Sequence, residues 1–169
     1  MSRPVRIGCS GWQYQDWRER FYASIEPLIE AGKLGPVLWQ LPPNFKRDDE
    51  RLANALRALP DGRHCFEFRE PSWFVPEVYE LLREHGAALV IGDRPEVLEF
   101  QTHEMTADWT FVRFHFGHRG RRGNYSRSEL EEWEQRVARW RREREVFLYF
   151  NNDWEGFAIQ NALWMAKRF

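Results

Sequence analysis

Two stretches of the sequence alternate apolar and chemically active side chains. In the segment HCFEFR, Glu67 and Arg69 alternate with phenylalanines, and in FVRFHF the alternating residues are Arg113 and His115. Successive side chains of a strand point to opposite faces. We therefore expect one carboxylate, one imidazole and two guanidiniums to face a common interior. Charges buried there must pair with each other, with water or with a ligand.

Further polar and aromatic residues follow apolar runs elsewhere in the chain. Ligand sites of parallel βα sheets form at the carboxyl ends of the strands, so these residues are candidates for the same site. They are Gln40, Asp93, Asn151 and Asp153, together with Trp12 and Trp73, whose rings could stack on a sugar or a base. The competing interpretation is an internal ion pair with tryptophans that pack in the core.

The segment 117–126, GHRGRRGNYS, combines three glycines with Arg119, Arg121 and Arg122 just before an expected helix. Glycines let the backbone approach an anion closely, helix N-terminal amides point outward, and arginine forks match phosphate oxygens. The segment therefore predicts an anion-binding loop. A solvated surface loop is the alternative.

The elements that must position these residues follow an alternating order. Apolar runs predict six strands, at 5–10, 36–41, 64–69, 88–93, 110–116 and 146–151. Most of the segments between them show a helical period, and Ser126 with Glu129 forms a capping-box pattern. Repeated βα units predict an α/β fold with a parallel sheet, either closed as a barrel or open, in a single domain over residues 1–169.

Composition and missing motifs exclude several classes of function. The formal net charge of −1 gives no global field for a polyanion, although a local basic patch keeps nucleic acid among the partners to test. The sequence has no secretory signal and no apolar run near the ~18 residues that cross a membrane, so we expect a cytoplasmic protein without a membrane partner. Phosphate-loop, dinucleotide, serine-hydrolase and zincin motifs are also absent from the sequence.

Seven segments, in this order, resemble the YecE-like family, domain of unknown function 72. They are IGCSGWQYQDWRERFY, GPVLWQLPPNF, HCFEFREPSWF, YELLREHGAALV, FVRFHF, NYSRSELEEW and FLYFNND. The resemblance implies a TIM-type (β/α) barrel of eight strands with a polar cluster at their carboxyl ends. It also implies a family without a securely established activity.

The sequence departs from the family between its first and second expected strands. The family has two further βα units there, whereas here Phe21 and Tyr22 lead almost directly to Gly35 and Pro36. We therefore expect a barrel shortened to about six parallel strands with covering helices. Three explanations remain open. They are a natural variant, an engineered or mis-assembled gene, and a chain that self-associates through unpaired strand edges.

The leading functional hypothesis is a hydrolase that acts on a phosphate ester or phosphodiester. Glu67, Asp93 and His115 would supply acid/base chemistry or bind a divalent metal, and Glu67→Gln should abolish turnover but leave folding intact. Arginines would hold the anion, with Asn151 and Asp153 orienting it. The alternatives are a non-catalytic module that binds an anion, a sugar or a nucleic-acid end, and an inactive barrel fragment.

Overall fold

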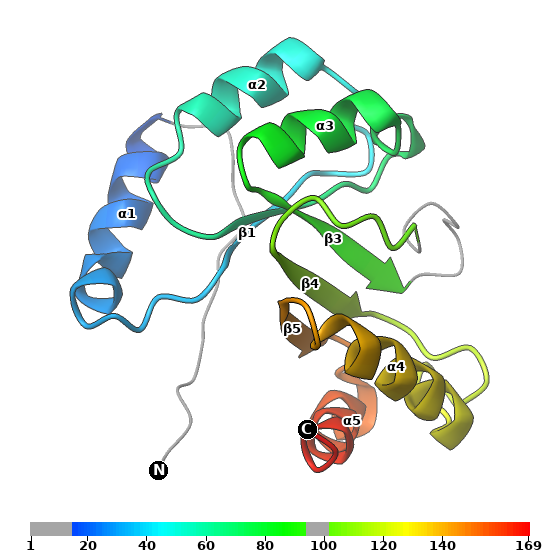
Figure 1. Ribbon diagram of the computed structural model, residues 1–169. Helices are drawn as coiled ribbons and strands as arrows, with labels where there is room; N and C mark the ends of the chain where they lie inside the picture. Colours follow the sequence, from blue (N-terminus) through cyan, green and yellow to red (C-terminus); the bar gives the residue numbers. More distant parts are fainter. Residues whose placement is uncertain (1–14, 94–101) are drawn as a thin grey trace.

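The computed structural model describes residues 15–93 and 102–169, with side chains from residue 21 onward. Within these ranges five parallel strands pair in the order of the sequence (Figure 1). They are β1 (Val37–Gln40), β2 (His64–Glu67), β3 (Ala88–Asp93), β4 (Trp109–Phe114) and β5 (Glu145–Phe150). Five of the predicted strands are thus confirmed, with their ends within two residues of the prediction. The sixth, at 5–10, lies outside the described residues.

Helices connect the strands, and local sequence signals set several of their ends. They are α1 (Gln15–Glu30), α2 (Asp49–Arg57), α3 (Pro76–Glu84), α4 (Arg127–Trp140) and α5 (Phe157–Ala166), with 3-10 turns η1 (Pro71–Trp73) and η3 (Trp154–Gly156). The predicted capping box is confirmed, because the Ser126 hydroxyl accepts from the amide of Glu129 and the Glu129 carboxylate accepts from the amide of Ser126. Pro76 occupies the first turn of α3, where its missing N–H costs nothing.

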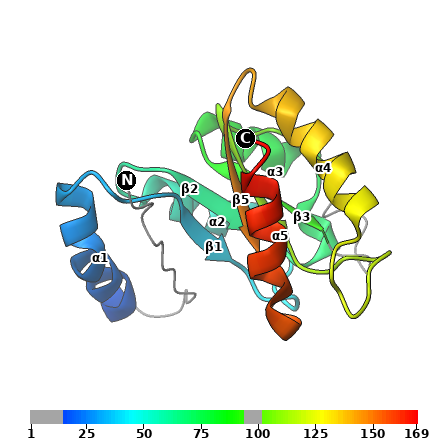
Figure 2. The same ribbon diagram turned by 90° about the horizontal axis from the view of Figure 1, so that it is seen from below.

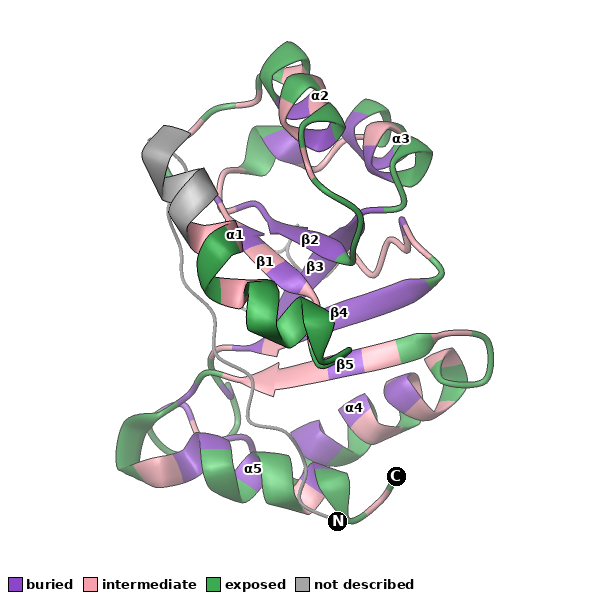
Figure 3. Cartoon of the chain, turned by 90° about the vertical axis from the view of Figure 1, so that its left-hand side faces the viewer, coloured by how far each residue is buried: buried purple, intermediate pink, exposed green. Residues whose placement is uncertain are grey.

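The outer face of the sheet carries two apolar clusters beneath the helices. Trp39, Phe66 and Leu89 pack with residues of α2 and α3 at one end of the sheet. At the other end, Ile91 and Phe114 pack with residues of α4 and α5. Figure 3 shows this division, with α2 and α3 on one side and α4 and α5 on the other. Burial of these apolar side chains against the helices is the main force that holds the layers together.

The inner face of the sheet changes character along the strands. Cys65, Val90, Phe111 and Phe147 form an apolar cluster near the amino ends. The next inward positions toward the carboxyl ends carry polar side chains, beginning with Glu67. In the described chain β1 and β5 are the edge strands of a half-barrel, seen from below in Figure 2.

Candidate functional site

Glu67 is the centre of the polar cluster on the inner face. Its side chain is completely buried, and Oε1 accepts a hydrogen bond of 3.0 Å from Nε of Arg69. Oε2 forms an ion pair with Nη1 of Arg113. The imidazole Nε2 of His115 lies 3.4 Å from Oε1. The structure thus brings together the four inward side chains that the alternation of the sequence predicts.

Gln40 at the end of β1 provides a second acceptor for both arginines. Its Oε1 accepts from Nη2 of Arg69 at 2.7 Å and from Nη1 of Arg113 at 2.8 Å. Gln40 is the register partner of Glu67 in the adjacent strand. An amide oxygen and a carboxylate at neighbouring positions therefore hold two planar guanidiniums in fixed orientations.

Gly92 lies beside Arg113 on β3, the strand between Arg113 and Glu67. Arg113 lies on β4 and Glu67 on β2, so the arginine side chain must pass across β3. The register partner of Arg113 on β3 is Gly92. Gly92 is two residues from Val90 and therefore faces the same inner side of the sheet. Neighbouring strands are about 4.8 Å apart, and a side chain at position 92 would stand in this path. Sequence reasoning missed this role of Gly92.

The charges in the cluster do not cancel. Burial by itself would raise the pKa of Glu67, but the hydrogen bond to His115 and the charge of Arg113 outweigh burial and bring the pKa to about 2. Glu67 is therefore a carboxylate at neutral pH. One carboxylate faces two guanidiniums, which are permanently charged. The site consequently carries an excess of positive charge before any protonation of His115.

His115 connects this cluster to the end of β5. Its Nδ1 lies 3.4 Å from the side-chain nitrogen of Asn151. The Asn151 amide can donate a hydrogen bond to Nδ1. A neutral His115 then carries its proton on Nε2, which points at Glu67. The tautomer is thus assigned from these contacts. Asn151 is placed by its own backbone N–H, which donates to the carbonyl of Phe114 at 2.8 Å.

Asp93 is not part of the Glu67 cluster. It shares the parity of Ile91, which packs under α4 and α5, and it accepts a hydrogen bond of 3.3 Å from Nε1 of Trp133 on α4. Nε2 of His118 lies 3.8 Å from its Oδ1. Burial raises the pKa of Asp93, and the hydrogen bond from Tyr125 opposes that rise only in part. Glu67, Asp93 and His115 therefore do not converge as a metal-ligand set, and the described residues contain no cluster of three His, Cys, Asp or Glu side chains that could hold a metal.

The glycine- and arginine-rich loop at 117–126 already encloses an anion, the carboxylate of Glu129. Its Oε1 accepts from the amides of His118 at 2.6 Å and Arg119 at 3.1 Å. Arg119 pairs with Glu132, Arg122 pairs with Glu155, and Arg121 is exposed. Two amides of the loop therefore bind a carboxylate from α4, and the binding of an external anion by this loop stays a prediction.

Of the remaining candidates, one lies in the core, one on the surface and one outside the described residues. Trp73 is 1% exposed and stacks on Phe68 with 4.6 Å between ring centroids, so it has no face for a ligand. Asp153 is exposed at the start of η3. Trp12 lies outside the described residues. Asn152, a further polar residue at the end of the last predicted strand, is buried, and its side chain donates to the carbonyl of Gly123.

Comparison with known protein families shows which proteins this chain is similar to. A family model described as "Protein of unknown function DUF72" matches residues 19–169. The chain belongs to the DUF72 family. It is 27% identical over 178 residues to the UPF0759 protein YunF of Bacillus subtilis (strain 168), an alignment that covers 88% of this chain and 62% of that protein.

Two solved structures from the DUF72 family are similar to this chain. One, from Thermotoga maritima MSB8, is 32% identical with a TM-score of 0.78, over 90% of this chain and 64% of that one. Another, from Enterococcus faecalis V583, is 28% identical with a TM-score of 0.74, over 87% of this chain and 65% of that one. This DUF72 chain therefore spans less than two thirds of the length of these relatives. In its described part, no helix has both the length and the apolar character that a membrane crossing requires.

Proposed function

We propose that the cluster around Glu67 binds a phosphate ester or phosphodiester and hydrolyses it. The observation that carries this proposal is the pair of guanidiniums held by a single buried carboxylate. Among the described residues, the contacts of Arg69 use Nε and Nη2 and those of Arg113 use Nη1. Nη1 of Arg69 and Nη2 of Arg113 keep donors for a ligand oxygen, and these side chains are 20% and 13% exposed.

In this proposal the residues of the cluster have different roles. Arg69 and Arg113 bind the phosphoryl oxygens and stabilise the charge that develops on them. Glu67, with its pKa of about 2, is a poor proton donor and orients the arginines instead. In hydrolysis a water oxygen forms the new P–O bond and the ester P–O bond breaks. His115 takes the proton from water at Nδ1, once the bound ligand displaces the Asn151 amide from that nitrogen, and returns it to the leaving alkoxide.

A non-catalytic anion-binding site is the second candidate, and one observation favours it. Both carboxylate oxygens of Glu67 are engaged by Arg69, Arg113 and His115. In this state the cluster has a strong field for an anion but holds no free carboxylate as a base. The same arginines would then recognise a phosphate, a sugar phosphate or a nucleic-acid end without turnover, and its affinity would fall steeply with salt.

The first experiment is a thermal melt with phosphate and sulfate, repeated with Mg²⁺ and Mn²⁺. A ligand that binds only the native state raises the Tm by mass action. We expect phosphate to raise the Tm of the wild type and of Arg142→Gln, a matched exposed arginine, but not that of Arg69→Gln. An equal rise in all three proteins would contradict the proposed site.

Release of nitrophenolate from bis(p-nitrophenyl) phosphate separates the two candidates. Turnover that is lost in His115→Gln, with the phosphate-induced rise in Tm retained, supports hydrolysis. Phosphate binding that depends on Arg69, with no product at any metal concentration, supports the non-catalytic site.

A further inference from the structure

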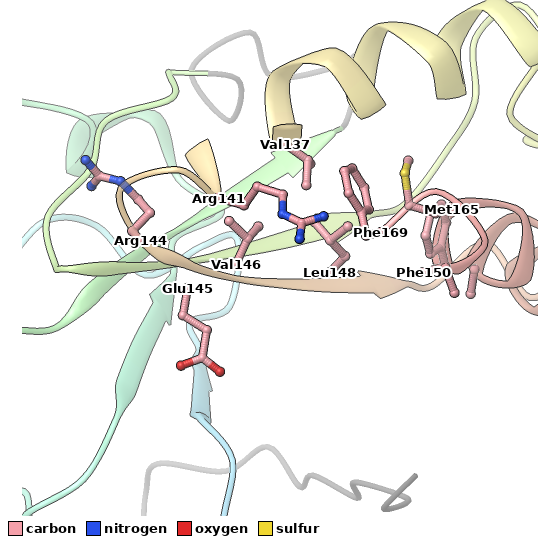
Figure 4. Close-up of a pocket in the computed structure, with 11 residues that line it drawn as sticks. Val137, Arg141, Arg144, Glu145, Val146, Leu148, Phe150, Met165 and Phe169 are labelled. Carbon is pink, nitrogen blue, oxygen red and sulfur yellow. The ribbon is translucent and has the colours of Figure 1, made fainter. Parts of the chain in front are cut away.

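A groove of about 540 Å³ lies between α4, β5 and α5 (Figure 4). Its floor is formed by the alternate residues Val146, Leu148 and Phe150 of β5, and Val137 and Met165 extend the apolar lining onto the two helices. These β5 side chains lie on the helix side of the sheet, opposite to the inward Phe147. The groove is therefore separate from the cluster around Glu67, and its volume is in the range of ligand pockets.

The groove has one cationic group whose charge is not balanced by a described acidic side chain. The guanidinium of Arg141 lies over the ring of Phe169, 5.1 Å from its centroid, and Figure 4 shows both beside Leu148. Arg144 is used elsewhere, because it donates to the carbonyl of Ala107 and lies 3.6 Å from Glu143.

The acidic residue of the lining does not compensate Arg141. Glu145 forms an ion pair of 2.6 Å with Arg63, and in Figure 4 its carboxylate points away from the apolar floor. The groove therefore combines an apolar floor with an exposed guanidinium beside Leu148. These two features together are complementary to an amphiphilic anion.

We propose that this groove binds a medium-chain carboxylate, with the alkyl chain on the β5 floor and the carboxylate on Arg141. A guanidinium fork matches the two oxygens of a carboxylate, and a single negative charge balances a single arginine. From Leu148 the apolar lining continues to Phe150 and Met165, which gives the alkyl chain a surface on one side of the guanidinium. Burial of the alkyl chain supplies the apolar part of the affinity.

The test is calorimetric titration of the whole chain with decanoate, kept below the concentration at which it forms micelles, and with 1-decanol and acetate as reference ligands. We expect one decanoate per chain, bound about tenfold more tightly than decanol, and no measurable binding of acetate. Arg141→Gln should weaken decanoate binding about tenfold and leave decanol binding unchanged. Arg142→Gln, the adjacent exposed arginine outside the lining, should bind both ligands like the wild type.

A second variant tests the location of the alkyl chain. Ala166 lines the groove from an exposed position on α5, so Ala166→Phe fills the groove without altering the buried core. This variant should lose both decanoate and decanol. The proposal is overturned if the wild type does not bind decanoate, if decanol binds equally well, or if Arg142→Gln loses as much affinity as Arg141→Gln. Since neither variant touches the cluster around Glu67, these outcomes are independent of the proposed phosphoester site.

Discussion

Glu67 and Asp93 are buried carboxylates at the carboxyl ends of adjacent parallel strands, and they lie on opposite faces of the sheet. Glu67 faces His115 and two guanidiniums, and the hydrogen bond from His115 together with the charge of Arg113 keeps its pKa at about 2. Asp93 faces the helix layer, where burial raises its pKa. The two carboxylates therefore make opposite contributions to the pH dependence of stability, and only Glu67 is placed among cationic ligands for an anion.

Replacement of Glu67 by Gln should reduce stability at neutral pH and flatten the acid limb of the stability profile. The folded pKa of about 2 is below the usual value of 4.5, so the contribution of this carboxylate is complete above the unfolded pKa and is lost as the pH falls toward 2. The linked contribution is on the order of 3 kcal/mol at pH 7. Urea unfolding of both proteins at neutral and acidic pH measures it.

This expectation corrects the sequence-based prediction that Glu67→Gln leaves folding intact. Glu67 is fully buried, and loss of one partner of a buried ion pair costs roughly 3–5 kcal/mol. Equal stability of variant and wild type at pH 7, with parallel curves into the acid range, would contradict the role of Glu67 as the anchor of the two arginines.

Replacement of Asp93 by Asn should have the opposite pH dependence. The folded pKa of Asp93 is raised, so its contribution is largest at low pH and is lost as the pH rises through that folded pKa. The free energy of unfolding of Asp93→Asn, relative to the wild type, should therefore increase with pH across the acid range. The same urea series measures this difference, and a decrease with pH would show that attraction to His118 outweighs burial.

Counting strand positions predicted the Glu67 cluster because two strands contain a clear alternation. HCFEFR and FVRFHF place apolar and charged residues on alternate faces, and Glu67 and Arg113 meet on the inner face as the pattern requires. Strand β3 contains no such signal, because all six of its residues are buried. Asp93 was selected only because it ends a predicted strand. Asp93 is two residues from Ile91 and so faces the same side, and only this spacing would have placed it on the helix side of the sheet.

The loop at 117–126 shows a different limit of sequence reasoning. Its glycines and arginines predicted an anion-binding loop, whereas in the structure the amides of His118 and Arg119 bind a carboxylate of the chain itself. The anion is Glu129, which is eleven residues from His118 in the sequence, and the capping-box pattern accounts only for its contact with Ser126. One carboxylate oxygen of Glu129 accepts from Ser126, and the other can accept from a different set of donors. Which donors it meets depends on where α4 packs in the fold.

Replacement of Glu129 by Ala should loosen this loop and shorten α4. The carboxylate accepts from the amides of His118, Arg119 and Ser126, so its loss leaves three donors without their partner. We expect a loss of about 1–2 kcal/mol of stability, the range for a helix cap. Hydrogen exchange at the amides of His118 and Arg119 should accelerate well beyond that global loss, while Thr110 in β4 serves as the internal control. Unchanged exchange at both loop amides would contradict this role.

Replacement of Gly92 by Val should separate Arg113 from Glu67. Gly92 is the register partner of Arg113 on the strand between them, and a branched side chain on its inner face would occupy the path of the guanidinium. The variant should lose phosphate binding, measured as the phosphate-induced rise in Tm, and should be destabilised by several kcal/mol because a buried pair is broken.

A double-mutant cycle distinguishes this steric effect from simple overpacking of β3. In an Arg113→Met background the ion pair is already absent, so Gly92→Val should cost only the overpacking part, about 1–3 kcal/mol. The coupling energy between positions 92 and 113 is then the part of the lost stability that is due to displacement of Arg113. If Gly92→Val costs the same in both backgrounds, the glycine serves only the packing of the strand, and the path of Arg113 across β3 does not depend on it.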